Sequence, residues 1–161
     1  MTSSRLSAAA RAIVVCGGVL LLDQVSKAIV VSSLAVGQYE QLWLGFRVTN
    51  TENSGLAFGI GQGQGFVLAV TVIALVLVLV WFALDPTRPG LWLGVGLLTG
   101  GALGNLVDRI RLDAVTDFID PPLWPAFNFA DVAITLGAVA LVLVSLKPAD
   151  GRDAKPKPGA G

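Results

Sequence analysis

Carboxylates gather between Gly101 and Asp131, at the ends of two long apolar runs, in a chain of 161 residues that has no histidine. Ionisable groups at membrane depth are energetically costly, so their presence there is itself a functional hypothesis. Without histidine the chain cannot build a Ser-His-Asp or Cys-His nucleophile or an HExxH zinc site. Acid–base chemistry near neutral pH therefore falls to Asp, Glu, Lys or water.

The candidate side chains occupy the ends of the last two apolar runs and the loop between them. They are Asn105, Asp108 and Arg109, then Asp113, Asp117 and Asp120, then Asn128 and Asp131. A short connection makes these two runs adjacent and antiparallel, so the groups are expected to converge at one interface. Asp23 and Lys27 lie one helical turn apart in the first run, and we expect them to pair and brace that run against the site.

Two carboxylates held close in a low-dielectric site do not both ionise easily. One keeps a proton while the other acts as a base, as in the aspartic proteases. Such a pair can activate water against an amide and protonate the departing amine. Spacing alone does not say which two aspartates form the pair.

The elements that must position these groups are those of an integral membrane protein, because 54% of the residues are hydrophobic and only 14% are charged. Four apolar runs approach the length needed to cross about 30 Å of hydrocarbon. They cover residues 12–31, 66–84, 91–107 and 127–146. We expect a mainly α membrane protein with four transmembrane helices in one domain, residues 1–147. The glycine-rich third run suits close helix packing.

Positive charge is distributed unevenly around the four runs. It lies before the first run (Arg5, Arg11), between the second and third (Arg88), and after the fourth, in the tail. The positive-inside rule therefore predicts that both termini are cytoplasmic. Residues 32–65 and 108–126 then face the extracytoplasmic side, where Trp43 and Trp124 would lie in an aromatic belt.

The segment 32–65 is expected to form a small extracytoplasmic flap. Residues 41–49 alternate apolar and polar side chains, which predicts a short strand, and the glycine-rich stretch that follows predicts turns. Three prolines between residues 121 and 125 predict an extended connection there. Residues 148–161, rich in Pro, Gly and Lys, predict a disordered cytoplasmic tail.

The first run resembles a cleavable signal peptide, but Asp23 and Lys27 interrupt it and favour an uncleaved span. The single Cys16 excludes an internal disulfide and is interpreted as a small buried apolar side chain. Ser26 next to Lys27 suggests a Ser-Lys protease. Neighbouring residues on a helix point about 100° apart, however, so this pair is poorly placed.

Five segments, in this order, resemble the bacterial lipoprotein signal peptidases (signal peptidase II). They are DQVSK (Asp23–Lys27), ENSGLAF (Glu52–Phe58), GGALGNLVDR (Gly100–Arg109), VTDF (Val115–Phe118) and FNFAD (Phe127–Asp131). Each is weak alone, but their order is specific. The chain differs from the family pattern at Glu52, Leu56 and Asp113 and in a short connection before Asp131. None of these differences removes a motif residue needed for chemistry.

The resemblance implies a membrane aspartyl endopeptidase in the bacterial cytoplasmic (plasma) membrane, with Asp117 and Asp131 as the catalytic pair. It also implies a set of residues that line the site and hold the substrate backbone: Asn53, Asn105, Arg109 and Asn128. The substrate would be a prolipoprotein with a diacylglyceryl-modified cysteine, cut just before that cysteine. Membrane lipids are the other expected partner, and no metal, organic cofactor or nucleic acid is implied.

The remaining charged residues are given supporting or solvent-exposed roles. We expect Asp108 to form a local ion pair with Arg109 that positions the end of the third span. Asp113 and Asp120 are interpreted as solvated loop charges. Gly55 would give the flap freedom to close over the site.

Two other classes of function stay open. A metal-dependent lipid-headgroup transferase would use the aspartates as magnesium ligands, but it needs a tighter cluster such as DxxDG, which this sequence lacks. A small proton-coupled transporter would relay protons along them. Four spans without an inverted repeat favour it less.

Overall fold

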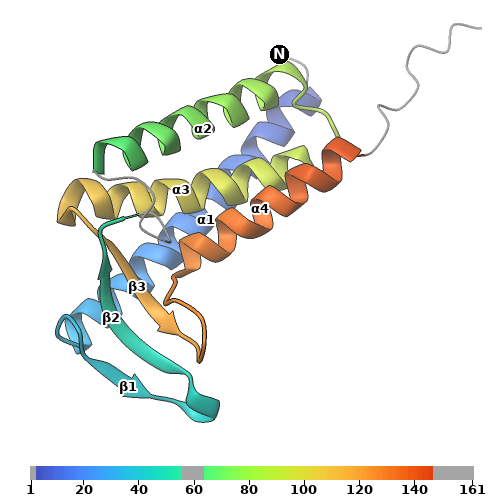
Figure 1. Cartoon of the computed structure of the whole chain (residues 1–161). Helices are drawn as coiled ribbons and strands as arrows, with labels where there is room; N and C mark the ends of the chain where they lie inside the picture. Colours follow the sequence, from blue (N-terminus) through green and yellow to red (C-terminus); the bar gives the residue numbers. More distant parts are fainter. Residues whose placement is uncertain (1–2, 56–63, 147–161) are drawn as a thin grey trace, which may run out of the picture.

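The computed structural model describes residues 3–55 and 64–146, which form four helices and a three-stranded sheet. The helices are α1 (Ser3–Ser33), α2 (Gln64–Leu84), α3 (Leu91–Leu112) and α4 (Phe129–Leu146), and the strands are β1 (Tyr39–Gln41), β2 (Arg47–Asn53) and β3 (Val115–Asp120). Helix α3 packs against the other three helices. The sheet lies across the C-terminal end of α3 and the N-terminal end of α4 (Figure 1).

Three of the described helices, α1, α3 and α4, are long and apolar enough to cross a membrane, and the apolar part of α2 (Ala69–Leu84) is shorter. These helices and the small sheet confirm the expected class, a mainly α membrane protein. Helix α1 begins at Ser3 rather than at residue 12, because its alanine-rich start favours helix. The predicted tail, residues 148–161, and the flap residues 56–63 lie outside the described residues.

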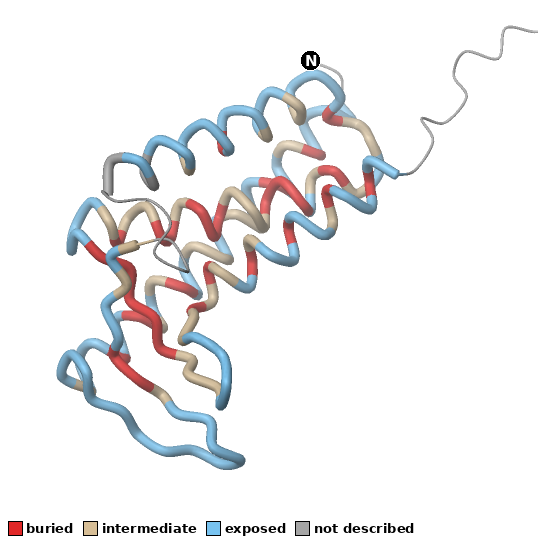
Figure 2. Tube along the Cα trace, in the orientation of Figure 1, coloured by how far each residue is buried: buried red, intermediate tan, exposed pale blue. Residues whose placement is uncertain are grey.

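Glycines allow α3 to approach its neighbours closely. A Cβ atom on Gly100 would lie 2.7 Å from the main-chain oxygen of Cys16 in α1, and one on Gly101 would collide with the carbonyl of Ala130 in α4. Figure 2 shows that the buried residues follow α3 and the facing sides of α1 and α4, whereas α2 is largely exposed. The helix-packing role predicted for the glycine-rich third run is therefore confirmed.

The sheet is antiparallel in the order β1-β2-β3. The prediction of one strand over residues 41–49 was wrong, because the chain reverses between β1 and β2. Leu44 (φ 57°) and Gly45 (φ 79°) make this reversal in the left-handed region, and apolar side chains continue through it, which hid the turn. Strand β3, in the connection predicted to be extended, pairs with β2 and joins the flap to the helix α3–α4 connection.

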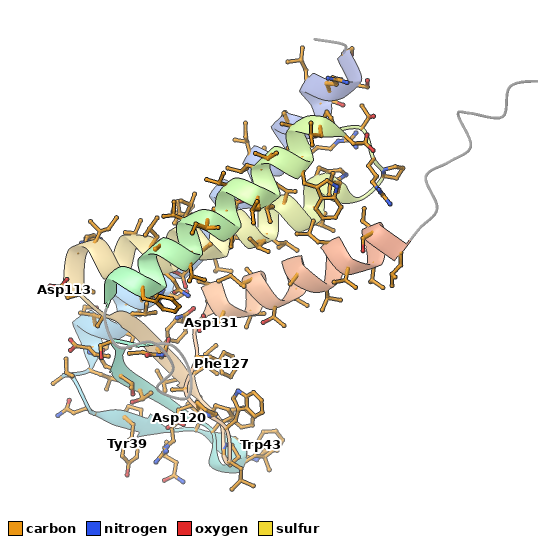
Figure 3. All side chains as sticks on the ribbon, turned by 45° about the horizontal axis from the view of Figure 1, so that its top comes forward. Tyr39, Trp43, Asp113, Asp120, Phe127 and Asp131 are labelled. Atoms are coloured by element: carbon orange, nitrogen blue, oxygen red, sulfur yellow. The ribbon has the colours of Figure 1, made fainter. Side chains whose placement is uncertain are left out.

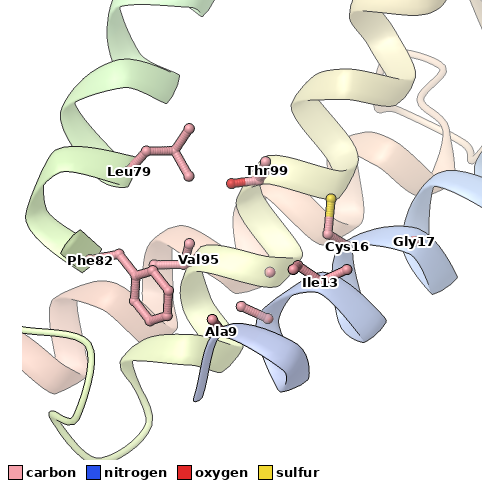
Figure 4. A pocket seen from close by; sticks show the side chains of 10 residues that line it. Ala9, Ile13, Cys16, Gly17, Leu79, Phe82, Val95 and Thr99 are labelled. Atoms are coloured by element: carbon pink, nitrogen blue, oxygen red, sulfur yellow. The ribbon is translucent and has the colours of Figure 1, made fainter. Parts of the chain in front are cut away.

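A cavity of about 350 Å³ lies between α1, α2 and α3, toward the N-terminal halves of α1 and α3 (Figure 4). Its walls include Ile13, Leu79 and Phe82. Cys16 also lines it and is only half-buried. The interpretation of Cys16 as a small buried apolar side chain was therefore wrong in its burial: it is half-buried, at the wall of the cavity.

Candidate active site

The fold brings Asp117 and Asp131 together from two different elements. Asp117 lies in β3, opposite Thr51 of β2, and is 3% exposed. Asp131 lies in the first turn of α4, where the helix dipole favours a carboxylate. The chain between them folds back because Phe127 and Ile119 exchange main-chain hydrogen bonds of 2.8 and 2.9 Å.

Asn128 connects the two carboxylates. Its side-chain Nδ2 donates to Asp117 Oδ1 at 2.6 Å, and its main-chain N–H donates to Asp131 Oδ2 at 3.2 Å. The main-chain N–H of Asp131 donates back to Asn128 Oδ1 at 2.9 Å. This reciprocal pattern is a capping box, so Asn128 is the N-cap of α4 as well as a ligand of both aspartates. Its side chain is fully buried.

Asn105, on α3, is the second amide between the carboxylates. Its Nδ2 donates to Asp131 Oδ1 at 2.8 Å. Its Oδ1 accepts from Lys27 Nζ at 2.9 Å and from Asn128 Nδ2 at 3.2 Å. Because an ammonium group only donates, Lys27 fixes which end of the Asn105 amide faces Asp131.

The flap supplies a third amide. Asn53, at the end of β2, donates from Nδ2 to Asp117 Oδ2 at 3.0 Å. The main-chain N–H of Gly55 donates to Asn53 Oδ1 at 3.1 Å, which turns the amide nitrogen toward the aspartate. In this structure Gly55 therefore orients Asn53, and the freedom of the flap to close stays a prediction.

Burial raises the pKa of Asp117 from its ordinary value to about 6. The hydrogen bond from Asn53 opposes this rise, the charge of Asp131 adds to it, and the hydrogen bond from Asn128 opposes it. Desolvation penalises the charged carboxylate more than the neutral amides stabilise it. Asp117 is thus suited to hold a proton at a pH where an ordinary aspartate has lost it.

A second group of charges lies beneath the amides. Lys27 Nζ forms ion pairs with Asp23 Oδ2 at 2.8 Å and Asp108 Oδ2 at 2.9 Å, and all three side chains are almost fully buried. Asp23 Oδ1 accepts the main-chain N–H of Ala130 at 2.9 Å, which ties α1 to the start of α4. The predicted Asp23–Lys27 pair is confirmed. The predicted Asp108–Arg109 pair was wrong, because Asp108 turns inward to Lys27.

The chain is similar to known proteins of one family. A family model described as "Signal peptidase (SPase) II" matches residues 15–147. The chain belongs to this family. A lipoprotein signal peptidase of Pelotomaculum thermopropionicum is 40% identical over 82% of the chain and 89% of the relative, and one of Gloeobacter violaceus is 38% identical over 88% and 84%.

Solved structures agree with the family. Two structures described as a bacterial membrane enzyme match at 30% identity, with TM-scores of 0.76 and 0.77. They cover 86% and 92% of this chain and 94% of each solved chain. The chain is therefore a multi-pass membrane peptidase, a hydrolase.

Arg109 of this signal peptidase II family member lies one turn after Asn105 on α3 and is half-buried. Its Nη1 donates to the main-chain oxygen of Asn105 at 3.4 Å. Its positive charge interacts electrostatically with Asp131 and Asp117. The structure thus brings all of the predicted site residues into one region: Asn53, Asn105, Arg109, Asp117, Asn128 and Asp131.

The loop carboxylates of the peptidase lie elsewhere. Asp113 is exposed at the end of α3, and Figure 3 shows Asp113 beside that helix end and Asp120 farther down the sheet, both apart from Asp131. The interpretation of Asp120 as a solvated charge was wrong, because Arg47 Nη2 lies 2.7 Å from its Oδ2 in an ion pair. Among residues 3–55 and 64–146, no three His, Cys, Asp or Glu side chains form a group that could hold a metal ion.

Sequence reasoning missed two residues that hold Asp108. Gln24 Nε2 donates to Asp108 Oδ1 at 3.0 Å, and the main-chain N–H of Thr116 donates to Asp108 Oδ2 at 3.2 Å. Both residues lie inside the segments that carry the family resemblance, DQVSK and VTDF. Their place in those segments was a signal for a structural role at the site.

Proposed function

We propose that this chain is an aspartyl endopeptidase that removes the signal peptide of prolipoproteins carrying a diacylglyceryl cysteine, by cutting just before that cysteine. The observation that carries the proposal is Asn128, which donates to Asp117 and to Asp131 and so holds the two carboxylates at one place. The relatives named lipoprotein signal peptidase support the same class of substrate. The raised pKa of Asp117 supports a pair that shares one proton.

In the proposed reaction Asp131, ionised, takes a proton from water while the water oxygen attacks the carbonyl carbon before the cysteine. Asp117, protonated, gives its proton to the carbonyl oxygen. When the C–N bond breaks, the amine of the modified cysteine leaves with the proton held by Asp131. Asp117 takes a proton back from one hydroxyl of the intermediate, so that the carbonyl re-forms in a carboxylic acid and both aspartates return to their starting states. The pair thus acts as base and acid in turn.

The neutral amides have a defined part in this proposal. Asn53 and Asn128 bind Asp117, and Asn105 binds Asp131. They orient both carboxylates without supplying a positive charge that would keep both ionised. Arg109, half-buried beside them, is placed to hold the substrate main chain.

The proposed location is the bacterial cytoplasmic membrane, with both termini cytoplasmic and the site near the extracytoplasmic face. The positive-inside rule supports this orientation, since Arg5, Arg11 and Arg88 lie at the end of the helices opposite the sheet. The substrate helix and its acyl chains would enter sideways from the lipid. The exposed outer side of α2 leaves room for such an approach (Figure 2).

The test uses the purified full-length protein and a diacylglyceryl-modified prolipoprotein, with and without a chelator. Asp117→Asn and Asp131→Asn should each lower the cleavage rate by about 10³-fold, because each removes one proton-transferring group. The chelator should have no effect. Chelator-sensitive cleavage, or full cleavage by both variants, would overturn the proposal in favour of a metal-dependent enzyme or another site.

Asp113→Asn is the matched control, because it removes an exposed carboxylate at the end of α3. It should cleave at the rate of the unaltered protein. A prolipoprotein without the diacylglyceryl group should be cut poorly. Equal cleavage of both substrates would contradict the proposed substrate while leaving the aspartyl mechanism in place.

A further inference from the structure

An apolar surface at the free end of the sheet lies away from the carboxylates. We name it the apolar tip, and it comprises Leu42, Trp43, Leu44, Phe46, Leu123 and Trp124. All six side chains are exposed, Trp43 by 81% and Trp124 by 68%. Figure 3 shows Trp43 at the far end of the hairpin from Asp131. The apolar tip is not part of a described membrane-spanning helix, so the helices do not explain its exposure.

Two loops build the apolar tip together. One is the β1–β2 turn, and the other is the connection from β3 to α4. They meet where a Cβ on Gly45 would lie 3.8 Å from Pro122, an ordinary van der Waals distance. Neither LWLGF (42–46) nor PPLWPA (121–126) contains a charged residue. The surface is therefore continuous and uncharged.

The backbone at the apolar tip is strained in a way that exposes apolar side chains. Leu44 has φ 57° and Leu123 has φ 65°. This left-handed conformation favours Gly or Asn and is disfavoured for leucine. Packing does not explain the choice, because Leu44 is 65% exposed and Leu123 is fully exposed. A leucine at a strained, exposed turn points to a ligand outside the protein.

The fold places the apolar tip at the depth of a membrane interface. Figure 1 shows the strands running across the helix axes, so that the tip extends sideways from the bundle, level with the helix ends that carry the sheet. Trp124 precedes the first residue of α4, Phe129, by five positions, and it can lie at most about 18 Å from it. Tryptophan side chains are enriched at this depth.

A polar rim bounds the apolar tip on the sheet side. Arg47 Nε donates to Asp120 Oδ2 at 2.7 Å, and the Arg47 guanidinium lies 4.9 Å from the centroid of the Tyr39 ring. The apolar side chains lie at the tip, and the Arg47–Asp120 pair lies behind them. This order matches the change from acyl chains to headgroups at the surface of a membrane.

We propose that the apolar tip inserts into the lipid leaflet on the sheet side of the membrane and anchors the free end of the sheet there. Its occupant is the boundary between phospholipid headgroups and acyl chains. The inference is independent of the proposed cleavage reaction. It has a structural consequence for the site, because β2 carries Asn53 and β3 carries Asp117, and both strands lead from the apolar tip.

The test uses the full chain with Trp81→Phe and Trp92→Phe, which leaves Trp43 and Trp124 as its tryptophans. The protein is reconstituted in phosphatidylcholine vesicles, either unbrominated or brominated at carbons 6 and 7 of the acyl chain. Tryptophan emission should fall at least twofold in the brominated vesicles and resist quenching by aqueous iodide. Emission that ignores the bromines and is quenched by iodide would overturn the proposal.

A second variant separates lipid binding from folding. Leu44→Asn with Leu123→Asn suits the left-handed backbone but removes both apolar side chains. Bromine quenching should weaken, while the midpoint of thermal unfolding in detergent stays the same or rises. Leu112→Asn, at the exposed end of α3, should leave the quenching unchanged. A lower midpoint for the double variant would show that the leucines pack structurally and would overturn the proposal.

A substrate-bound surface would give a different result. In detergent, without a bilayer, a prolipoprotein added to the protein should leave the iodide quenching of Trp43 and Trp124 unchanged. Protection by the prolipoprotein alone, without quenching by brominated lipid, would assign the apolar tip to the substrate and overturn the lipid anchor.

Discussion

Two groups of carboxylates, both linked to Asn105, are held in opposite ways in this protein. Asp23 and Asp108 share the ammonium of Lys27, at 2.8 and 2.9 Å. Asp117 and Asp131 are held by the neutral amides of Asn53, Asn105 and Asn128. The difference lies in the charge of the hydrogen-bond donor.

That difference distinguishes the carboxylates that stabilise the structure from those suited to proton transfer. An ammonium between two carboxylates attracts both and holds them in fixed positions, which suits a structural ion pair. Neutral amides fix the geometry but offset desolvation only in part, and the pKa of Asp117 rises to about 6. Asn105 joins the two groups, because it accepts from Lys27 and donates to Asp131. We call Asp23, Lys27 and Asp108 the lysine group, and Asn53, Asn105, Asn128, Asp117 and Asp131 the amide group. Through Asn105, the lysine group orients the amide group.

Removing the lysine should have the largest effect on the fold. In Lys27→Met two buried carboxylates lose their shared cation, which should destabilise the protein by about 3–5 kcal/mol. The measurement is the midpoint of thermal unfolding in detergent. Adding Asp108→Asn to Lys27→Met removes one of the uncompensated charges and should restore part of the loss. If Lys27→Met alone is as stable as the unaltered protein, Lys27 does not stabilise the fold through Asp23 and Asp108.

At Asn128 a substitution can remove the hydrogen bond to Asp117 while keeping the N-cap of α4. Serine caps a helix about as well as asparagine but has no amide to donate to Asp117. Asn128→Ser should therefore unfold near the midpoint of the unaltered protein while cleavage falls by about 10²-fold, the usual order for losing one positioned donor. Asn128→Ala should lose activity and also about 1 kcal/mol of stability. Equal activity of the serine variant would show that the bridge to Asp117 is dispensable.

These two groups also show what the sequence can and cannot predict. The spans were predictable because hydropathy is a local property, and Asp117 and Asp131 could be chosen because the motifs occur in a fixed order. The partner of Asp108 was predicted wrongly. Adjacent residues on a helix point about 100° apart, so Arg109 was a poor partner, and Lys27 is distant in sequence.

The register in which β3 pairs with β2 could not be predicted from the sequence either, because it also depends on contacts between distant segments. The register changes between Val48 and Thr51, and only after that change does Thr51 lie opposite Asp117 and Asn53 opposite Val115. Such a bulge leaves an extra residue unpaired in one strand, so the register on its far side does not follow from alternation alone. The alternation of residues 41–49 carried no signal of the reversal at Leu44, because leucine seldom adopts that conformation.

The pH dependence of cleavage should report the pKa of Asp117. The folded pKa of Asp117, about 6, lies above its unfolded value, so the site holds its shared proton below pH 6 and loses it as pH rises. In the free enzyme kcat/KM should therefore decline above about pH 6. Asn53→Ala removes a hydrogen bond that lowers this pKa, so the decline should move to higher pH.

The control for this shift is Glu52→Gln, the exposed neighbour of Asn53 on β2. Successive strand residues point to opposite faces, so the charge change lies away from Asp117 and the profile should stay in place. A decline that moves to lower pH in Asn53→Ala would contradict the assignment of the proton to Asp117. An unmoved decline in both variants would place the titrating group elsewhere.

The smallest effect is expected from the third charged pair, Arg47 and Asp120. Their side chains approach within 2.7 Å, as closely as the lysine group, but that of Arg47 is 44% exposed. Solvent reaches this pair through Arg47 and screens it more strongly than the buried pairs of Lys27, so Arg47→Gln should cost at most about 1 kcal/mol. Its effect on the unfolding midpoint should also shrink in high salt. A loss of stability comparable to that of Lys27→Met would mean that distance rather than burial decides the strength of these ion pairs. Burial would then not explain why the carboxylates bound by Lys27 differ from those bound by the asparagines.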